Sequence, residues 1–309
     1  MKWYSVFSFL GSLFSVLSSP IPEHCDILSL SGGGSFGAVE IGILDDLLEK
    51  EDIPRYYDVI TGISAGGLNA AFLSTHHDIS KSVKAIIPIY KELKTSDVYK
   101  QSYSIFKKWG WYDTTPLEGF IARVLNNTVM IPSIQPSSKK RSTLIGSTNL
   151  NTEKLEIHHF YVGDNIDRKV DILMATTAIP ILFPPRDIRG EFHVDGGVLT
   201  NEMVTEALSF KKCKTYDIYL INAKNKKSIS KEITGFTNYM KTLFSVFMNI
   251  FDNELSRINM VCMFSNTRLH IYYPNTTELE QFSILDFDHG TELYTLGKNH
   301  YYKVDKYIC

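Results

Sequence analysis

Short apolar runs alternate along the chain with longer segments in which apolar residues recur at every third or fourth position. The short runs have the length of buried strands, and the longer segments have the periodicity of helices. This alternation is typical of an α/β protein, so we expect a three-layer α/β/α sandwich with a largely parallel central sheet. The expected strands are residues 26–30, 57–60 (broken at the following Thr-Gly), 143–146, 157–162 and 215–222, and the expected helices are residues 36–50, 65–73, 203–210 and 236–264.

No segment rich in Pro, Gly or Ser divides the chain. We therefore expect one domain, with a core at residues 26–210 that the strands and helices of residues 211–309 complete. Within the last expected helix, apolar residues between positions 236 and 251 form a stripe at helical spacing. Such a stripe belongs either to the core or to a membrane-facing lid.

Residues 1–18 have the pattern of a secretory signal peptide, in which a positive charge precedes an uncharged stretch and small residues end it at Ser18. An uncleaved anchor and a buried terminal helix are the alternatives, although a bilayer span needs roughly 20 apolar residues. The sequons at Asn126 and Asn275 fit a secretory route. We expect a secreted or lumenal glycoprotein, whereas an anchor would make the protein membrane-associated.

The four cysteines beyond this leader leave the redox state open, because two disulfides and one or two free buried thiols are equally compatible with a chain of this size. They are Cys25, Cys213, Cys262 and Cys309.

Charge and composition exclude several classes of function. The chain has 32 Lys and Arg residues against 34 Asp and Glu residues, without a long basic block, so we expect no nucleic-acid partner. The histidine pairs at 76–77 and 158–159 lack metal-ligand spacing and are expected to be solvated. No metal and no cofactor are expected, and the oligomeric state is not predicted.

A glycine run, Gly32-Gly33-Gly34-Ser35-Phe36-Gly37, lies between the first expected strand and helix. It satisfies the dinucleotide-binding pattern G-x-G-x-x-G, which would make the protein a nucleotide-dependent oxidoreductase. Consecutive glycines also allow a sharp turn that directs free N–H groups at an anion, which can equally be the oxyanion of an acyl-transfer intermediate. A tight turn without a ligand is the third interpretation.

A second motif, Gly62-Ile63-Ser64-Ala65-Gly66, again follows a strand and precedes a helix. Gly62 and Gly66, two positions either side of Ser64, permit the strained elbow that exposes a nucleophilic hydroxyl. The helix that begins at Ala65 adds free N–H groups and a positive dipole end beside a developing negative charge. We therefore expect Ser64 to be a nucleophile.

The base for this serine comes from a third motif or from a histidine. Asp195 is followed by Gly196 and Gly197, which let the backbone approach another loop closely. His193 lies two residues earlier and is a conceivable base, although we expect it to be a supporting or surface residue. His289, after Asp288, would fit an α/β-hydrolase order, but too few strands precede Ser64 for that fold.

These three motifs, in this order, resemble those of the patatin-like phospholipase family. The segment from Asp113 to Leu117 is similar to a short Asp-Thr-x-Pro-Leu segment of the family. The segment from Ala175 to Pro185 is similar to the stretch that precedes the family's catalytic Asp. The chain departs from the family at Phe36, where Arg or Lys is often found, and at Ser31, where an acidic residue often precedes the glycines.

The resemblance implies a patatin-like fold and a Ser64–Asp195 dyad without histidine, in which Asp195 accepts the proton of Ser64. It also implies a lipid acyl hydrolase of phospholipase A type, a serine carboxylic-ester hydrolase that acts on acyl lipids at a membrane or micelle surface. A catalytically silent lipid-binding or storage glycoprotein of the same fold is the alternative. The expected oxyanion hole consists of backbone N–H groups of Gly32, Gly33, Gly34 and Gly37, helped by Ala65.

Overall fold

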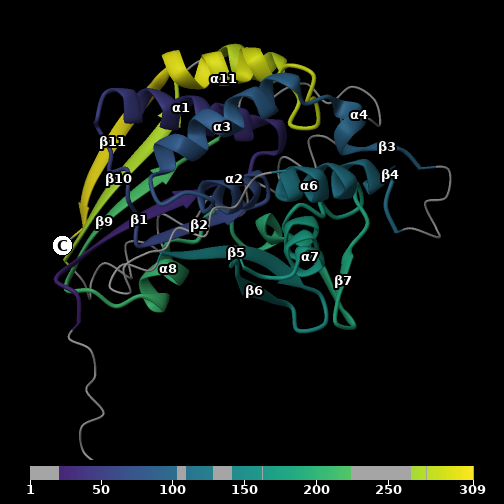
Figure 1. The fold of residues 1–309 in the computed structure, drawn as a ribbon, viewed down its shortest axis with the longest axis horizontal. Helices are drawn as coiled ribbons and strands as arrows, with labels where there is room; N and C mark the ends of the chain where they lie inside the picture. The colour runs from purple at the N-terminus through teal and green to yellow at the C-terminus, as the bar shows by residue number, and fades with distance from the viewer. Residues whose placement is uncertain are drawn as a thin grey trace, which may run out of the picture.

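The computed structural model describes residues 21–102, 109–127, 141–161, 163–223, 266–275 and 277–308. Within these residues, nine strands form one sheet in the order β11-β10-β9-β1-β2-β5-β8-β7, with β6 paired to β5 (Figure 1). The strands are β1 (His24–Leu30), β2 (Val59–Ile63), β5 (Ser142–Asn149), β6 (Lys154–His159), β7 (Arg186–Ile188), β8 (Glu191–Asp195), β9 (Thr215–Ile221), β10 (Asn266–Pro274) and β11 (Tyr301–Ile308).

The five central strands, from β10 to β5, are mutually parallel, and every strand pair outside them is antiparallel. A second, two-stranded sheet pairs β3 (Lys100–Gln101) with β4 (Tyr112–Asp113). The expectation of a largely parallel central sheet flanked by helices is confirmed. Strands β9, β10 and β11 extend the same sheet that β1 and β2 begin.

Helices cover the sheet on both sides (Figure 1). On one side lie α1 and α11, with α3 beside them, and α8 lies on the other side. The helices and helical turns are η1 (Gly34–Phe36), α1 (Gly37–Glu49), α2 (Ala65–Leu73), α3 (Ile79–Glu92), α4 (Thr95–Val98), α6 (Thr115–Asn127), α7 (Ile166–Thr176), η2 (Gly196–Val198), α8 (Val204–Phe210), η4 (Thr277–Gln281) and α11 (Gly290–Asn299). Among the described residues, no helix is both long and apolar enough to cross a bilayer.

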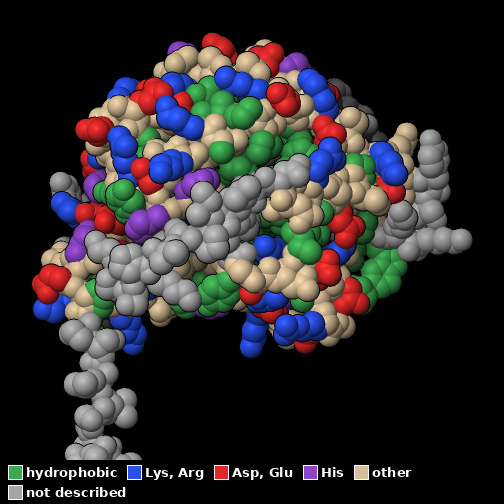
Figure 2. Space-filling view, in the orientation of Figure 1, with side chains coloured by type: hydrophobic (Ala, Val, Ile, Leu, Met, Phe, Trp, Pro, Cys, Tyr) green, Lys and Arg blue, Asp and Glu red, His purple; other side chains and the backbone are tan. Residues whose placement is uncertain are grey.

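Two hydrophobic cores lie on the two faces of the sheet, because successive side chains of a strand point to opposite sides. Leu28 and Leu30 of β1 belong to the core under α1, α2 and α3. Cys25 and Ile27 of the same strand belong to the core under α8. On the face drawn in Figure 2, side chains of both charges are interspersed, and hydrophobic side chains show between α11 and α3.

The observed elements differ from the expected ones mainly in their ends. Strand β2 continues through Thr61 and Gly62, because each pairs with β1 and β5 on either side. Strand β6 begins and ends three residues earlier than expected. The expected leader at residues 1–18 and the expected helix at 236–264, with its apolar stripe, lie outside the described residues.

A disulfide joins Cys25 at the start of β1 to Cys213 just before β9, with Cα atoms 6.0 Å apart. Because β1 and β9 are parallel neighbours, it links two adjacent strands at their amino ends. Of the alternatives left open by the sequence, one bridge is therefore present; Cys262 and Cys309 lie outside the described residues.

Candidate active site

The three sequence motifs meet at the carboxyl ends of the parallel strands. Leu30 of β1 pairs with Gly62 of β2, so the glycine run and the elbow leave the sheet side by side. On the other side of β2, Ile63 pairs with Gly146 of β5. The next residue of β5, Ser147, pairs with Asp195 of β8. Ser64 and Asp195 therefore extend from strands on either side of β5, next to Gly146.

Ser64 adopts a strained backbone conformation, with φ 55° and ψ −124°. A non-glycine residue with positive φ is uncommon and persists only where its surroundings enforce it. Here the Ser64 N–H donates to Thr176 Oγ1 at 2.9 Å, and Thr176 Oγ1 donates to the Gly146 carbonyl at 2.6 Å. Thr176 thus ties the elbow to the neighbouring strand, a role that no sequence motif indicated.

The elbow needs small residues because its backbone packs against itself and against β1. A Cβ at Gly62 would overlap the Gly66 carbonyl, and one at Gly66 would lie 2.5 Å from the carbonyl oxygens of Leu30 and Ser31. Any side chain at either position would push Ser64 away from the glycine run. The reason given for these glycines from the sequence is consistent with this packing.

The glycine run passes directly beside Ser64. A Cβ at Gly32 would lie 3.3 Å from the Ser64 Cβ, and one at Gly37 would lie 3.1 Å from the Ala65 Cβ. Gly34 has φ +59° and packs against the Ile284 carbonyl, so only glycine fits there without strain.

Two N–H groups of the run are already used within the protein. The Gly32 N–H donates to the Asn201 carbonyl at 3.2 Å, and the Gly37 N–H donates into the turn η1. In the part of the chain that the structure describes, no backbone acceptor stands opposite the N–H groups of Gly33 and Gly34. The expected set of oxyanion donors therefore narrows to Gly33, Gly34 and Ala65, while Gly32 and Gly37 shape the loop.

Asp195 is 3% exposed, and its carboxylate Oδ1 accepts the Gly197 N–H at 2.8 Å. Its own N–H donates to the Ala178 carbonyl at 2.9 Å. A Cβ at Gly196 would lie 2.7 Å from the Gly146 oxygen and 2.8 Å from Ile63 Cδ1. The backbone at Gly196 therefore packs closely against β5 and against Ile63 of β2, and the role of Asp195 as the base stays a prediction.

His193 is not a surface residue, as one sequence interpretation had it. It is 1% exposed, and its Nδ1 lies 2.9 Å from Ser147 Oγ, while its Nε2 lies 3.7 Å from Glu156 Oε2. The other partner of Ser147 Oγ is His158 Nε2, at 2.7 Å. The His193 ring therefore makes its polar contacts with residues of β5 and β6. These contacts support β8, the strand that carries Asp195.

His158 was expected to be solvated, and that expectation is wrong. It is 6% exposed, and burial lowers its pKa to about 4. Its position on β6 turns it toward β5, which the histidine pair alone did not indicate. His289, by contrast, is partly exposed beside Asp286 and Glu292.

A buried carboxylate behind the glycine run escaped the sequence motifs. Glu40 of α1 is fully buried and accepts the N–H of Ser31 at 2.7 Å and the Ser31 hydroxyl at 3.2 Å. Its other oxygen accepts Asn69 Nδ2 at 2.9 Å, and Asn69 Oδ1 accepts the hydroxyl of Tyr90 at 2.7 Å. Burial raises the pKa of Glu40 to about 8, although these hydrogen bonds lower it.

This network connects three elements at the site, because Ser31 precedes the glycine run, Asn69 lies on α2 and Tyr90 on α3. The signal in the sequence was an acidic residue among apolar neighbours of α1, between Val39 and Ile41.

Gly34, Ser64 and Ala65 line an apolar cavity of about 100 Å³. Its walls are almost entirely hydrocarbon and come from helices α2, α3 and α6, together with the segment after α7. Representative lining residues are Leu68, Phe72, Ile86, Phe120, Val124 and Phe183. Ser64 therefore borders a space whose apolar walls suit a hydrocarbon chain.

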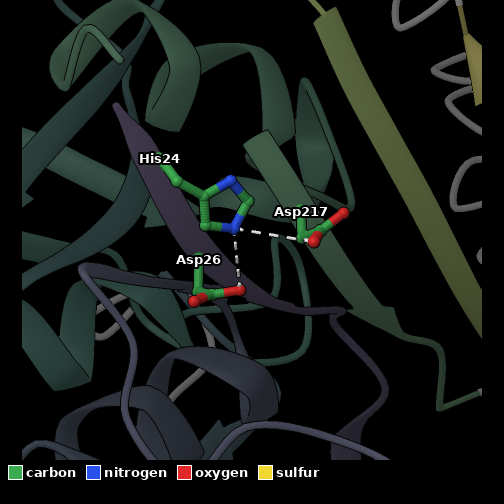
Figure 3. A group of neighbouring side chains, drawn as sticks. All are labelled: His24, Asp26 and Asp217. Atoms are coloured by element: carbon green, nitrogen blue, oxygen red, sulfur yellow. Dashed lines mark ion pairs between the residues drawn. The ribbon is translucent and has the colours of Figure 1, made fainter. Parts of the chain in front are cut away.

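Two groups of side chains combine residue types that can bind a metal ion. In the first, His24 Nε2 lies 3.5 Å from Asp26 Oδ1 and 3.5 Å from Asp217 Oδ2, at the amino ends of β1 and β9 (Figure 3). Arg268 of β10 donates to both carboxylate oxygens of Asp217. Since a cation already pairs with Asp217, we interpret this group as an ion-pair network that joins three strands.

The second group consists of Glu156, Glu191 and His193. Asn149 Nδ2 lies between the two carboxylates and donates to them at 2.9 and 2.7 Å. Asn149 Oδ1 accepts the N–H groups of the turn after β5, so the amide cannot rotate to offer its oxygen. The two carboxylates of this group therefore already accept hydrogen bonds from the Asn149 amide, and we assign no metal to the group.

The patatin-like phospholipase family model matches residues 28–208. This chain belongs to the patatin-like phospholipase family. The matched residues run from β1 to α8 and include the glycine run, the elbow and Asp195. The family match therefore covers the part of the chain that carries the candidate site.

Several relatives are similar to the chain over about 60% of its length. The uncharacterized protein R571 of Acanthamoeba polyphaga mimivirus is 27% identical over 184 residues, 58% of this chain and 60% of that protein. A cGAMP-activated phospholipase of Escherichia coli (strain TW11681) is 27% identical over 230 residues, 63% of this chain and 60% of that protein. The rabbit (Oryctolagus cuniculus) calcium-independent phospholipase A2-gamma is 26% identical over 207 residues, 61% of this chain and 26% of that protein.

The aligned part thus spans 60% of the length of the first two relatives and about a quarter of the third. Two of these relatives are named as phospholipases, and the activity of this chain stays a prediction. The roles of the individual site residues stay predictions.

Proposed function

We propose that this protein is a lipid acyl hydrolase of phospholipase A type, which cleaves carboxylic esters of glycerophospholipids or related acyl lipids. The observation that carries the proposal is the position of Ser64, in the lining of an apolar cavity and beside the glycine run. An acyl chain in that cavity would bring its ester carbonyl to the Ser64 hydroxyl. The phospholipase names of two relatives are consistent with this substrate class.

In the proposed reaction, Asp195 accepts the Ser64 proton while Ser64 Oγ attacks the ester carbonyl. The N–H groups of Gly33, Gly34 and Ala65 would hold the resulting oxyanion. The intermediate collapses with loss of the alcohol, which takes the proton from Asp195 and leaves an acyl-serine. Asp195 then deprotonates a water molecule that hydrolyses the acyl-serine, which releases the fatty acid and restores Ser64.

Asp195 is a weak base in water, where an aspartate has a pKa near about 3.9. The alkoxide of an ester leaves more readily than the amine of an amide, so a weak base suits ester cleavage better. The expected alternative, a silent lipid-binding or storage glycoprotein, would use the same cavity without turnover. Lipid binding without release of fatty acid would favour that alternative.

The decisive experiment measures fatty-acid release from mixed phospholipid vesicles by the protein and its Ser64→Ala variant. Release should fall at least about 10³-fold without the nucleophile. Asp195→Asn should have a similarly severe effect, while His193→Gln should retain most activity because its ring contacts Ser147 rather than Ser64. Equal release by the protein and Ser64→Ala would contradict the mechanism, and loss with His193→Gln alone would identify a different base.

We also propose that the protein enters the secretory pathway, where oxidising conditions favour disulfides such as Cys25–Cys213. Asn126 and Asn275 are both exposed, as glycosylated asparagines must be. An uncleaved anchor that holds the protein at a membrane is the alternative.

A further inference from the structure

Two large apolar side chains are exposed in the segments that precede β4 and β7 in the chain. Both strands lie at one end of the molecule (Figure 1). Trp109 is 60% exposed and Ile181 is 58% exposed. We call these two residues the Trp109–Ile181 tip. An exposed apolar residue is ordinary by itself, so the tip matters only if other observations single it out.

The backbone at both residues supplies one such observation. Trp109 has φ 56° and Ile181 has φ 71°. For a β-branched residue such as Ile, positive φ is a genuine outlier, and Asn or Gly would adopt it with less strain. Strained residues cluster at functional sites, where their surroundings hold them. Here the strained conformation carries apolar side chains into solvent, which folding alone does not favour.

The two segments are held together by backbone hydrogen bonds. The Trp111 N–H donates to the Ile181 carbonyl at 3.0 Å, and the Tyr112 N–H donates to the Leu182 carbonyl at 2.9 Å. Gly110 packs so closely on Pro184 that a Cβ there would lie 2.7 Å from the Pro184 nitrogen. Hydrogen bonds and close packing therefore hold the two segments of the tip together, although they are far apart in the sequence.

The same segment connects the tip to the candidate active site. Ile179 and Phe183, on either side of Ile181, line the apolar cavity, and the Phe183 N–H donates to the Ile179 carbonyl at 2.8 Å. One residue earlier, the Ala178 carbonyl accepts the N–H of Asp195. The stretch from Ala178 to Phe183 thus contacts the candidate base, contributes to the cavity wall and carries Ile181 of the tip.

A further apolar side chain, Phe192 of β8, lies next to Trp109. The ring of Trp109 packs on that of Phe192, with centroids 5.1 Å apart. The Phe192 carbonyl accepts the N–H of Leu150, which is itself exposed. Indole rings favour the boundary between lipid headgroups and hydrocarbon, where an apolar body and a polar N–H are both accommodated.

We propose that the Trp109–Ile181 tip inserts into the interface of a phospholipid bilayer and docks the cavity wall against it. This inference rests on the proposed function, because it names the surface through which the same site meets its lipid. Docking would let an acyl chain pass from the bilayer into the cavity beside Ile179 and Phe183 without crossing water.

The test uses the full chain and vesicles of phosphatidylcholine with phosphatidylglycerol. In the double variant Trp109→Asn with Ile181→Asn, partition into vesicles should fall at least about tenfold. Because Asn tolerates positive φ, the variant should melt at the same temperature as the native chain or higher. The matched control is Tyr56→Asn with Phe210→Asn, which removes two exposed apolar side chains elsewhere and should leave partition unchanged.

A second measurement uses the fluorescence of Trp109 to report on its surroundings. The chain has three tryptophans, so replacement of Trp3 and Trp111 by Phe leaves Trp109 as the sole tryptophan, whose emission can be excited selectively. Its emission should shift to shorter wavelength on vesicles and be quenched by brominated acyl chains. Unchanged emission, or undiminished partition of the tip variant, would overturn the proposal; a lower melting temperature of that variant would instead identify a structural role and also overturn it.

Hydrolysis separates this proposal from the proposed function. The tip variant should retain turnover of p-nitrophenyl butyrate as a dissolved monomer but lose at least about tenfold on vesicles. Ser64→Ala should bind vesicles like the native chain and hydrolyse neither substrate. Tip-dependent binding without hydrolysis by the native chain would refute the proposed function alone, whereas equal loss on both substrates in the tip variant would refute the docking role.

Discussion

At the scale of single residues, the site depends on side chains that hold backbone in uncommon conformations. Ser64 keeps a positive φ because Thr176 accepts its N–H, and Thr176 in turn donates to Gly146. Glu40 holds Ser31, the residue before the glycine run, through two hydrogen bonds. These buried polar groups position the nucleophile and the oxyanion loop relative to each other.

Glu40 gives a prediction about pH. Its pKa is about 8 in the folded protein, against an ordinary value of 4.5. Between these two values the folded state binds more protons than the unfolded state, so the contribution of Glu40 to stability falls as pH rises. It is fully present below about pH 4.5 and lost above about pH 8. The loss is on the order of a few kcal/mol.

Urea unfolding at several pH values between 4.5 and 8.5 tests this prediction. Glu40→Gln, which mimics the protonated acid, should show a smaller decline of the unfolding free energy than the native chain. The control Glu92→Gln changes an exposed carboxylate at the end of α3 and should follow the native profile. Parallel profiles for the native chain and Glu40→Gln would show that Glu40 does not titrate in this range.

At the scale of elements, close helix packing decides which glycines matter. Helices α1 and α11 approach so closely that a Cβ at Gly297 would overlap the Val39 carbonyl, and one at Gly42 would overlap the Tyr294 carbonyl. Gly119, on the exposed side of α6, has nothing within 4 Å of the same position.

We therefore expect opposite effects from the same substitution. Gly297→Ala should lower the free energy of unfolding by about 1–3 kcal/mol, because backbone on the facing helix must move. Gly119→Ala should raise it by roughly 0.5–1 kcal/mol through helix propensity alone. Urea denaturation of both variants measures these changes, and a destabilisation of equal size in both would contradict the packing of α1 on α11.

At the scale of the whole molecule, the two ends of the parallel strands carry different features. The candidate site lies at the carboxyl ends of the strands, whereas the disulfide and the His24 network lie at the amino ends. The disulfide spans 188 residues of sequence, so its removal frees a long loop in the unfolded chain.

Cys25→Ser with Cys213→Ser should therefore lower the free energy of unfolding by about 2–4 kcal/mol. Turnover of a soluble ester should change little, because the two substitutions lie at the amino ends of the strands, opposite the candidate site. Peptide mapping under non-reducing conditions, on protein expressed with its leader, should recover the linked pair and an N-terminus at Ser19. Cys25 and Cys213 recovered as free thiols, or a chain that keeps residues 1–18, would contradict the proposed secretory route.

The sequence determined those features that depend on local backbone. The alternation of apolar runs indicated the parallel sheet, and β1, α1, α2, β9 and α8 were predicted within a few residues. The glycine run, the elbow and the Asp-Gly-Gly motif could be recognised because each requires a conformation or a close approach that few residues allow. Helices α3, α6 and α7 were not predicted, and α3 carries Pro88 and several charges among its apolar positions.

Only the tertiary structure decided the partners of these local features. Thr176 is 112 residues from Ser64, Asn69 is 29 residues from Glu40, and Cys213 is 188 residues from Cys25. Packing selects such pairs, since no pattern along the chain records which side chains the strand order brings together. The cavity has the same origin: its walls come from several helices that meet only when the sheet has formed.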